Sequence, residues 1–254
     1  MSARAVAVGE SENELRGLGV RDLPRARSRM HGRDWWRFAK LAALVPCILV
    51  AFTLTLALVY RVVTPPSTLM LGRWLTGQSV MRAAVPLDAI SPLLVQGVIA
   101  AEDQRFCMHD GVDWEVIQGL VEDENGPSRG GSTITMQTVK NVFLWGGRSY
   151  VRKLIELPLS LFVDVVWGKR RTLEIYLNIV EWGDGLYGAE AAAQYWFHKS
   201  ARKLTRREAA LLVSVMPNPI ERHAGKPSPE VRARAAMIEG RMDGMDELMG
   251  CLKR

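Results

Sequence analysis

Two adjacent acids followed by an aromatic residue and a histidine are the first residues of this sequence whose types and spacing could do chemistry. They are Glu102-Asp103, Phe106 and His109. They follow an apolar run that a helix capped by Ser91 would explain. Glu102 then lies at the margin of the apolar face, where partial loss of water makes a carboxylate a stronger base. Glu102 is therefore the candidate general base, and a solvated acidic pair at a helix end is the alternative.

Two glycines and two hydroxyl residues lead into another predicted helix. Residues 130–137 read GGSTITMQ, and Lys140 lies about two turns of helix further on. Free backbone N–H groups at a helix start favour an anion, and Lys140 would add positive charge. Ser132, Gln137 and Lys140 are therefore candidate contacts to an anionic substrate. An ordinary Ser or Thr cap is the alternative for this helix start.

Charged residues at helical spacing form the third candidate stretch. Glu156 lies four residues after Arg152 and three after Lys153, so the three side chains can meet on one side of a helix. The flanking residues are strongly apolar, which makes the charged face narrow and favours a groove lining over a surface ion pair. Arg148 adds a further cation just upstream. Pro158 predicts a bend in the helix just after Glu156.

The remaining stretches before residue 225 also read as helices. Residues 169–178, KRRTLEIYLN, predict a helix on which Glu174 and Asn178 share a face. Thr205 and Glu208 have the spacing of a capping box at the start of a later helix. Because alternating strand patterns are few, the fold class is predicted to be all-α.

Residues 41–60, LAALVPCILVAFTLTLALVY, form a run of twenty residues without a charge. As a helix this run is about 30 Å long, the hydrocarbon thickness of a bilayer. Seven Arg or Lys residues lie in 21–40 and two in 61–80. The positive-inside rule then predicts a cytoplasmic N-terminus and a large domain on the other side. A cleaved signal peptide is the alternative.

These patterns divide the 254 residues into five segments. We expect a basic cytoplasmic tail (1–37), a transmembrane anchor (38–60), a linker (61–90), a catalytic domain (91–224) and a C-terminal helix packed on that domain (225–254). The formal net charge is +6, with arginines concentrated before the anchor. No nucleic-acid partner is expected.

The sequence contains three cysteines. Cys47 lies in the apolar anchor, so Cys107–Cys251 is the disulfide available to the rest of the chain. We expect no bond between them, because nothing in the sequence places the two together.

Taken in order, these stretches resemble the five motifs of the peptidoglycan glycosyltransferases, which polymerise lipid II into glycan strands. The motifs match at Glu102 to Gly111, Gly130 to Gln137, Arg152 to Glu156, Lys169 to Asn178, and Arg207 to Leu212. Met136 departs from the family's usual glutamine, and Thr172 from its usual aliphatic residue. The match covers about residues 90–220. The short chain is similar to the monofunctional biosynthetic enzymes of Gram-negative bacteria (glycosyltransferase family 51).

The resemblance implies a lysozyme-like helical domain with a smaller membrane-associated lobe, here within residues 110–130, after one transmembrane helix of the bacterial inner membrane. It implies a periplasmic catalytic domain that joins sugars by β-1,4 links, with inversion, and releases undecaprenyl pyrophosphate. Glu102 would be the base and Glu156 the second essential acid. Contacts to the substrate and its pyrophosphate would come from Ser132, Gln137, Lys140, Arg148, Arg152, Lys153 and Asn178.

The expected partners are lipid II, the growing glycan chain and the bilayer, and cell-wall synthesis or division proteins could join them. No obligatory cofactor is expected. A divalent cation, Mg²⁺ or Mn²⁺, could accompany the pyrophosphate, although no ligand cluster marks a site for it. Asp103 could hold the helix end or bind such a metal, and we favour the structural role.

Two other functions remain open on the sequence alone. A lysozyme-like hydrolase would share the two carboxylates and the helical fold, but it has no need for the basic cluster between Lys140 and Lys153. A non-catalytic membrane-tethered scaffold would tolerate replacement of Glu102 and Glu156.

Overall fold

The computed structural model describes residues 32–122, 130–147 and 149–253. Most of the predicted basic tail, the candidate contact Arg148 and residues 123–129 of the predicted lobe lie outside the described residues. The chain divides into two compact units, residues 1–49 and residues 50–254.

Helix α1 (Gly32–Tyr60) contains the predicted anchor. Within the described part of the chain, its segment Ala39–Tyr60 is the one helix long and apolar enough to cross a membrane, with a mean hydropathy of 2.5. Large apolar side chains along it, such as Leu44 and Phe52, are exposed. These properties fit a membrane span.

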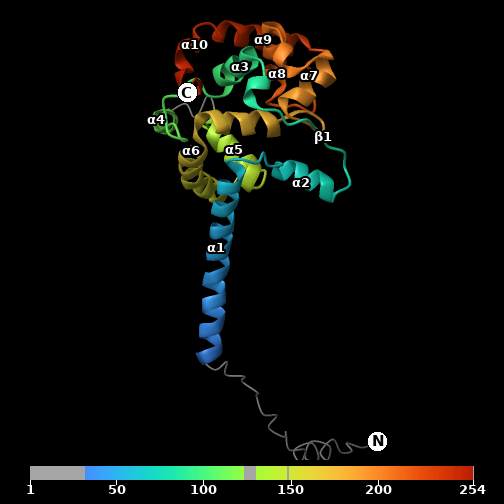
Figure 1. Cartoon of the computed structure of the whole chain (residues 1–254). Coiled ribbons are helices and arrows are strands. Elements are labelled where there is room, and N and C mark those ends of the chain that lie inside the picture. The colour runs from blue at the N-terminus through green and yellow to red at the C-terminus, as the bar shows by residue number, and fades with distance from the viewer. Residues whose placement is uncertain (1–31, 123–129, 148, 254) are drawn as a thin grey trace, which may run out of the picture. The chain divides into compact units, whose positions relative to one another are not determined.

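The unit of residues 50–254 is built mainly of helices (Figure 1). After α1 come α2 (Thr68–Leu75), α3 (Pro92–Glu102), α4 (Trp114–Glu122), α5 (Ile134–Phe143), α6 (Tyr150–Ile179), α7 (Ala189–Phe197), α8 (Arg206–Val215), α9 (Pro229–Arg241) and α10 (Met245–Leu248). The described residues also form the short 3₁₀ helices η2 (Leu87–Ala89), η3 (Ala201–Lys203) and η4 (Gly250–Leu252). The predicted helical fold class is confirmed.

A small sheet accompanies the helices. Its strands are β1 (Met81–Arg82), β2 (Glu181–Gly183) and β3 (Leu186–Tyr187), in the spatial order β1-β3-β2. Strand β1 runs parallel to β3, whereas β2 runs antiparallel to it. The sheet therefore joins a segment before α3 to the turn that follows α6.

Side-chain caps set where the helices of the site begin. Ser91 accepts a hydrogen bond from the Leu93 N–H, as predicted for the start of α3. Thr205 and Glu208 form the predicted capping box at the start of α8.

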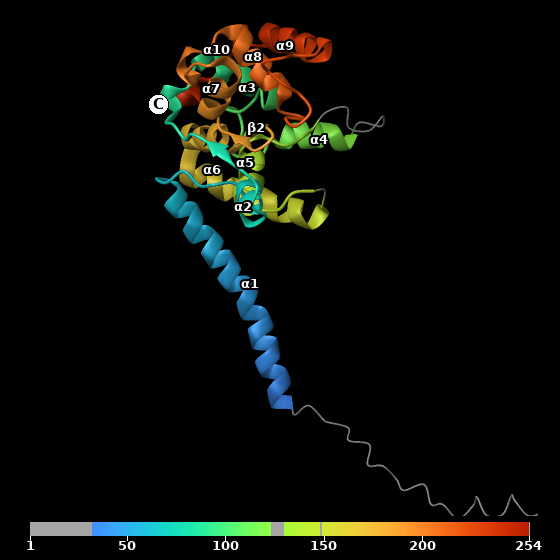
Figure 2. The same ribbon diagram turned by 90° about the vertical axis from the view of Figure 1, so that its right-hand side faces the viewer.

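Two apolar cores organise this unit. The larger core lies among α3, α7, α8 and α9, where Leu94, Trp182 and Leu212 are fully buried (Figures 1 and 2). The smaller core brings Met70 of α2 and Val139 of α5 together with the first half of α6 and the last turns of α1. Helix α6 contributes to both cores and so holds them together.

The break in α6 lies at Gly168, not at the proline where we predicted a bend. Gly168 has φ 67° and ψ 172°, the non-helical backbone inside α6. A positive φ costs glycine little because it has no Cβ, whereas Pro158 is accommodated within the helix. The turn at Gly168 redirects the second half of α6 into the larger core.

The segment predicted as a linker, residues 61–90, is fixed to the domain by the second half of α6. Arg171 donates hydrogen bonds of 3.0 and 3.1 Å to the Tyr60 carbonyl oxygen at the end of α1. Glu174 accepts a hydrogen bond from the Leu87 N–H at 3.0 Å. Hydrogen bonds from the polar face of this helix therefore hold both ends of the segment between Tyr60 and Leu87 against the domain.

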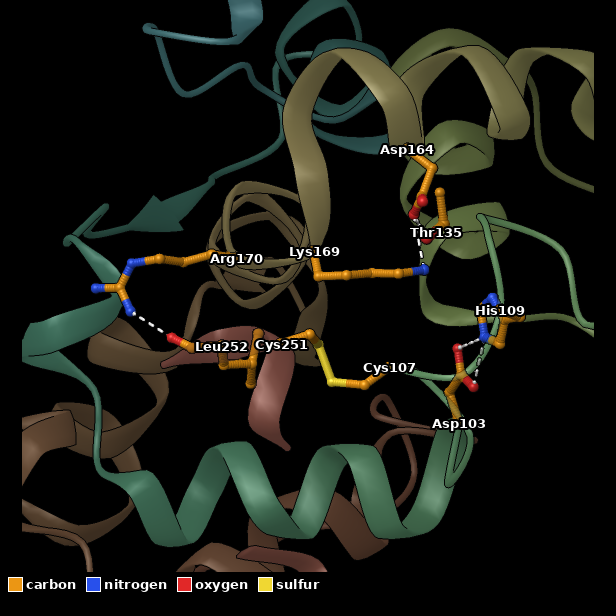
Figure 3. Close-up of a disulfide and its surroundings, with 9 residues drawn as sticks. All are labelled: Asp103, Cys107, His109, Thr135, Asp164, Lys169, Arg170, Cys251 and Leu252. Carbon is orange, nitrogen blue, oxygen red and sulfur yellow. Dashed lines mark hydrogen bonds and ion pairs between the residues drawn. A yellow bond between two sulfur atoms is a disulfide. The ribbon is translucent and has the colours of Figure 1, made fainter. Parts of the chain in front are cut away.

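Cys107 and Cys251 form a disulfide, so the expectation that they stay apart is wrong (Figure 3). The bond joins the loop after α3 to η4, across a sequence separation of 144 residues. Arg170 of α6 donates a hydrogen bond to the Leu252 carbonyl oxygen at 3.2 Å, which holds η4 beside that loop. Only the return of the chain through α9 and α10 brings the second cysteine there.

Exposed apolar side chains are present beyond the residues predicted for the membrane-associated lobe. Trp114 of α4 is exposed within that prediction, but so are Trp74 of α2 and Tyr150 and Leu154 of α6. Helix α2 and the first half of α6 contribute to the smaller core. Exposed apolar side chains are therefore not confined to residues 110–130.

Candidate active site

A cavity of about 870 Å³ lies at the end of α3. Glu102 and the two residues that follow it line one side, and residues 130–133 with Gln137 line another. The lining also includes Arg105, Asp113 and Val116, Pro217, which follows α8, and Arg234 and Arg241 of α9. The first and second motifs therefore face one cavity, as their predicted chemistry requires.

The Glu102 carboxylate is half-buried and held by a side-chain amide. Gln137 Nε2 donates a hydrogen bond to Glu102 Oε2 at 3.0 Å, and the Tyr176 hydroxyl donates to Gln137 Oε1 at 3.1 Å. Burial raises the pKa of Tyr176 well above its ordinary value, and the charges of Glu102 and Asp103 raise it further. The phenol therefore stays protonated and able to donate.

Asp103 holds the start of α5. Its Oδ2 accepts a hydrogen bond from the Ile134 N–H at 2.9 Å, and its Oδ1 lies 3.0 Å from His109 Nε2 (Figure 3). Thr133 accepts a hydrogen bond from the Met136 N–H. These two N–H groups therefore already have partners, as the alternative of an ordinary capped helix start predicts. The geometry fits the structural role favoured for Asp103.

An ion pair that is largely shielded from solvent lies beside Phe106 of the first motif. Lys169 Nζ lies 2.8 Å from Asp164 Oδ1 (Figure 3). It also lies 5.0 Å from the centroid of the Phe106 ring. Thr135 of α5 donates a hydrogen bond to the same Asp164 oxygen at 3.3 Å. Gly111, with φ 78°, passes so close to α6 that a Cβ there would lie 2.6 Å from the Ser160 carbonyl oxygen.

Glu156 is the centre of the third motif and is only 2% exposed. Lys153 Nζ lies 2.7 Å from Glu156 Oε1, and Arg152 Nη1 lies 3.3 Å from Glu156 Oε2. Lys153 also donates a hydrogen bond to the Ser132 hydroxyl at 3.0 Å, which links the third motif to the cavity wall. The predicted convergence of these three charges is confirmed.

Lys140 lies in the electrostatic field of the same cluster. Burial lowers the pKa of its ammonium; Glu156 and Glu102 oppose this shift, whereas Arg152 and Lys153 add to it. Among the described residues, no hydrogen bond or ion pair joins Lys140 to another side chain. The cluster is net positive, because it contains one carboxylate, Glu156, and three cations, Lys140, Arg152 and Lys153.

Asn178, also predicted to contact the substrate, lies elsewhere. It is fully buried and bonds the backbone of Val85 twice, accepting from its N–H at 2.9 Å and donating to its carbonyl oxygen at 2.8 Å. A further hydrogen bond runs to the Glu174 carbonyl oxygen. The structure thus places Asn178 as a clamp on the segment before α3 and not among the cations.

Some groups at the site had no assigned role in the sequence analysis. Tyr176 was visible as part of the fourth motif, but only the fold shows that its hydroxyl meets Gln137. Arg234 and Arg241 had no sequence signal, because they come from a helix predicted merely to pack on the domain. Across residues 32–122, 130–147 and 149–253, no group of three His, Cys, Asp or Glu side chains gathers that could hold a metal ion.

Comparison with known proteins identifies the family. A family model described as Transglycosylase matches residues 70–243. A biosynthetic peptidoglycan transglycosylase of Rhodopseudomonas palustris is 49% identical over 209 residues, 81% of this chain and 92% of the relative. Proteins of the same name from Rhizobium meliloti and Brucella suis are 48% and 47% identical, over 87% and 86% of this chain and 95% and 100% of theirs. The resemblance seen in the motifs is thus confirmed, and the chain belongs to the transglycosylase family.

Proposed function

We propose that the chain is a peptidoglycan glycosyltransferase, which polymerises lipid II into β-1,4-linked glycan strands for the bacterial cell wall. The observation that carries the proposal is one cavity lined by a positioned carboxylate, Glu102, and by Ser132, the hydroxyl that Lys153 contacts. Such a pairing suits a reaction that needs a base at a hydroxyl and positive charge at a leaving diphosphate. The family and its relatives support the same activity.

The reaction is a displacement at the anomeric carbon of the lipid-linked sugar. The 4-hydroxyl oxygen of the acceptor sugar forms a bond to that carbon, and Glu102 takes the hydroxyl proton. The bond from the anomeric carbon to the diphosphate oxygen breaks, and the undecaprenyl pyrophosphate leaves with the electron pair. Attack from the face opposite the leaving group inverts the α-linked donor and gives a β link.

The cations balance the charge that develops on the leaving group. Lys140 is the strongest candidate contact, because no described acidic side chain forms an ion pair with it. Lys153 and Arg152 share Glu156, and a buried carboxylate between two cations fixes their positions. Glu156 therefore acts by orienting the cations rather than by moving a proton.

Anchoring the site at a membrane suits a lipid-linked substrate. Helix α1 would be a single span with a cytoplasmic N-terminus, because the Arg and Lys residues are concentrated before it. The Cys107–Cys251 disulfide supports a periplasmic domain, since such bonds persist in oxidising compartments. The exposed apolar residues of α2 and α6 would touch the bilayer. A divalent cation at the diphosphate and partners from cell-wall synthesis or division stay predictions.

The test is incubation of the detergent-purified protein with labelled lipid II, beside Glu102→Gln and a control, Glu247→Gln. Glu247 is an exposed acid of α10 that does not line the cavity. We expect long, lysozyme-sensitive polymer from the wild type and the control, and a rate about 10²–10⁴ lower from Glu102→Gln. Polymer from all three would remove Glu102 as the base. Absence of polymer from the folded wild type would overturn the proposed function.

A further inference from the structure

Two arginines of α9 form part of the cavity wall without an evident structural role. Arg234 and Arg241 both line the cavity that contains Glu102. They lie seven residues apart, which is about two turns, so both occur on one side of the helix. In the sequence they lie far from Lys140, Arg152 and Lys153, the cations proposed to bind the diphosphate.

Neither guanidinium has an acidic partner within the described parts of the chain. Nε of Arg234 is buried and has no hydrogen-bond acceptor there. By contrast, Arg206 and Arg207 on the neighbouring helix α8 pair with Asp243 and Glu239. A half-buried arginine without a partner is costly, and an anion that enters the cavity would relieve this cost.

The anion that binds these two arginines should differ from the leaving diphosphate. That diphosphate is assigned to Lys140 and Lys153, neither of which is part of the lining that the arginines share. Lipid II also carries a short peptide with free carboxylates on its muramyl sugar. Guanidinium groups bind carboxylates in bidentate geometry, which suits a flexible peptide that must be held beside a glycan.

We propose that Arg234 and Arg241 bind the carboxylates of the peptide carried by the glycan in the cavity. This inference rests on the proposed function and adds a specificity determinant to it. The second source of anionic charge in the cavity is the diphosphate of the acceptor lipid, and the experiment has to separate the two.

The experiment compares two substrates that differ only in the peptide. One is unmodified lipid II, and the other has its peptide carboxylates converted to amides, with the diphosphate unchanged. The variants are Arg234→Gln and Arg241→Gln. The matched control is Arg232→Gln, an exposed arginine of α9 that does not line the cavity and donates to the Pro227 carbonyl oxygen. The readout is the ratio of kcat/KM between the two substrates.

The wild type and the control should prefer the carboxylate substrate about tenfold, as one charged hydrogen-bonded contact suggests. Each variant should lose most of this preference. If Arg234→Gln fails to fold by circular dichroism, Arg241→Gln decides, because its side chain is exposed. An equal loss on both substrates would overturn the proposal and point to the acceptor diphosphate. A preference that persists in the variants would also overturn it.

A binding measurement separates this inference from the proposed function. Isothermal titration with a soluble disaccharide-peptide, which has neither lipid nor diphosphate, requires no turnover. Binding by the wild type that weakens about tenfold in Arg241→Gln would support the inference even if no polymer formed. Equal binding by both proteins, or none by the wild type, would overturn the inference and leave the polymerase function intact.

Discussion

The side-chain amide of Gln137 is held at both ends between Tyr176 and Glu102. Its carbonyl oxygen accepts from the Tyr176 hydroxyl at 3.1 Å, so its NH₂ group is directed to the Glu102 carboxylate at 3.0 Å. The protonated, buried phenol of Tyr176 thus fixes the orientation of the amide, so that its NH₂ end meets the Glu102 carboxylate. Gln137 is therefore a positioning residue for the general base.

Replacing Gln137 with alanine should slow the chemical step while substrate binding changes little. The carboxylate would lose its fixed orientation, and misplacement by about 1 Å can cost about a hundredfold. We expect kcat to fall about ten- to a hundredfold, with KM within about threefold of the wild-type value. Steady-state kinetics on lipid II measure both. Tyr176→Phe, which removes only the outer hydrogen bond, should have a smaller effect on kcat. An unchanged kcat in Gln137→Ala would refute the positioning role.

Lys140 makes substrate binding sensitive to alkaline pH. Burial lowers the pKa of its ammonium, so this group loses its proton at a lower pH than a free lysine does. A neutral amine cannot balance a diphosphate, so KM should rise as the pH increases through that lowered pKa. Lys140→Arg keeps its charge and should move the rise in KM to higher pH. A KM profile in Lys140→Arg that matches the wild type would show that another group causes the pH dependence.

The disulfide should contribute strongly to the stability of the domain. A bond that closes a loop of this length typically adds about 2–5 kcal/mol to the free energy of unfolding. Urea unfolding should therefore shift to lower denaturant when the wild type is reduced, or when Cys251 is replaced by serine. Cys251→Ser should respond no further to reductant, which is the internal control. Equal unfolding of oxidised and reduced wild type would contradict this prediction.

Local features of the site could be read from the sequence because local spacing determines them. Glu156 meets Arg152 and Lys153 since helical geometry puts residues three and four apart on one side. The caps at Ser91 and Thr205 likewise depend on a few adjacent residues. Such contacts need no knowledge of the tertiary fold.

Other features could not be predicted because they depend on contacts between residues that are far apart in the sequence. Cys251 reaches Cys107 only after α9 and α10 have packed on α3, and no short pattern encodes that path. Arg234 enters the cavity for the same reason. The bend of α6 at Gly168 was missed because a proline is the stronger local signal, although this helix tolerates it.

Asn178 was predicted from its motif to contact the substrate, whereas in the fold it bonds the backbone of Val85. Its side chain bonds both the N–H and the carbonyl oxygen of Val85, in the segment before α3. Asn178→Ala would leave these backbone groups without their partners in a partly buried position. The expected loss in the free energy of unfolding is about 1–3 kcal/mol.

Urea unfolding measures this loss, and kinetics on the folded variant separate it from a role in binding. If Asn178 is a clamp, KM for lipid II should stay within about twofold of wild type under conditions where Asn178→Ala is fully folded. Gln194→Ala removes an exposed side chain whose one bond among the described residues is to Glu190. It is the matched control and should change stability by less than about 0.5 kcal/mol. A variant of wild-type stability with a KM raised about tenfold or more would show instead that Asn178 contacts the substrate, because loss of a charge-assisted contact acts on binding and not on folding.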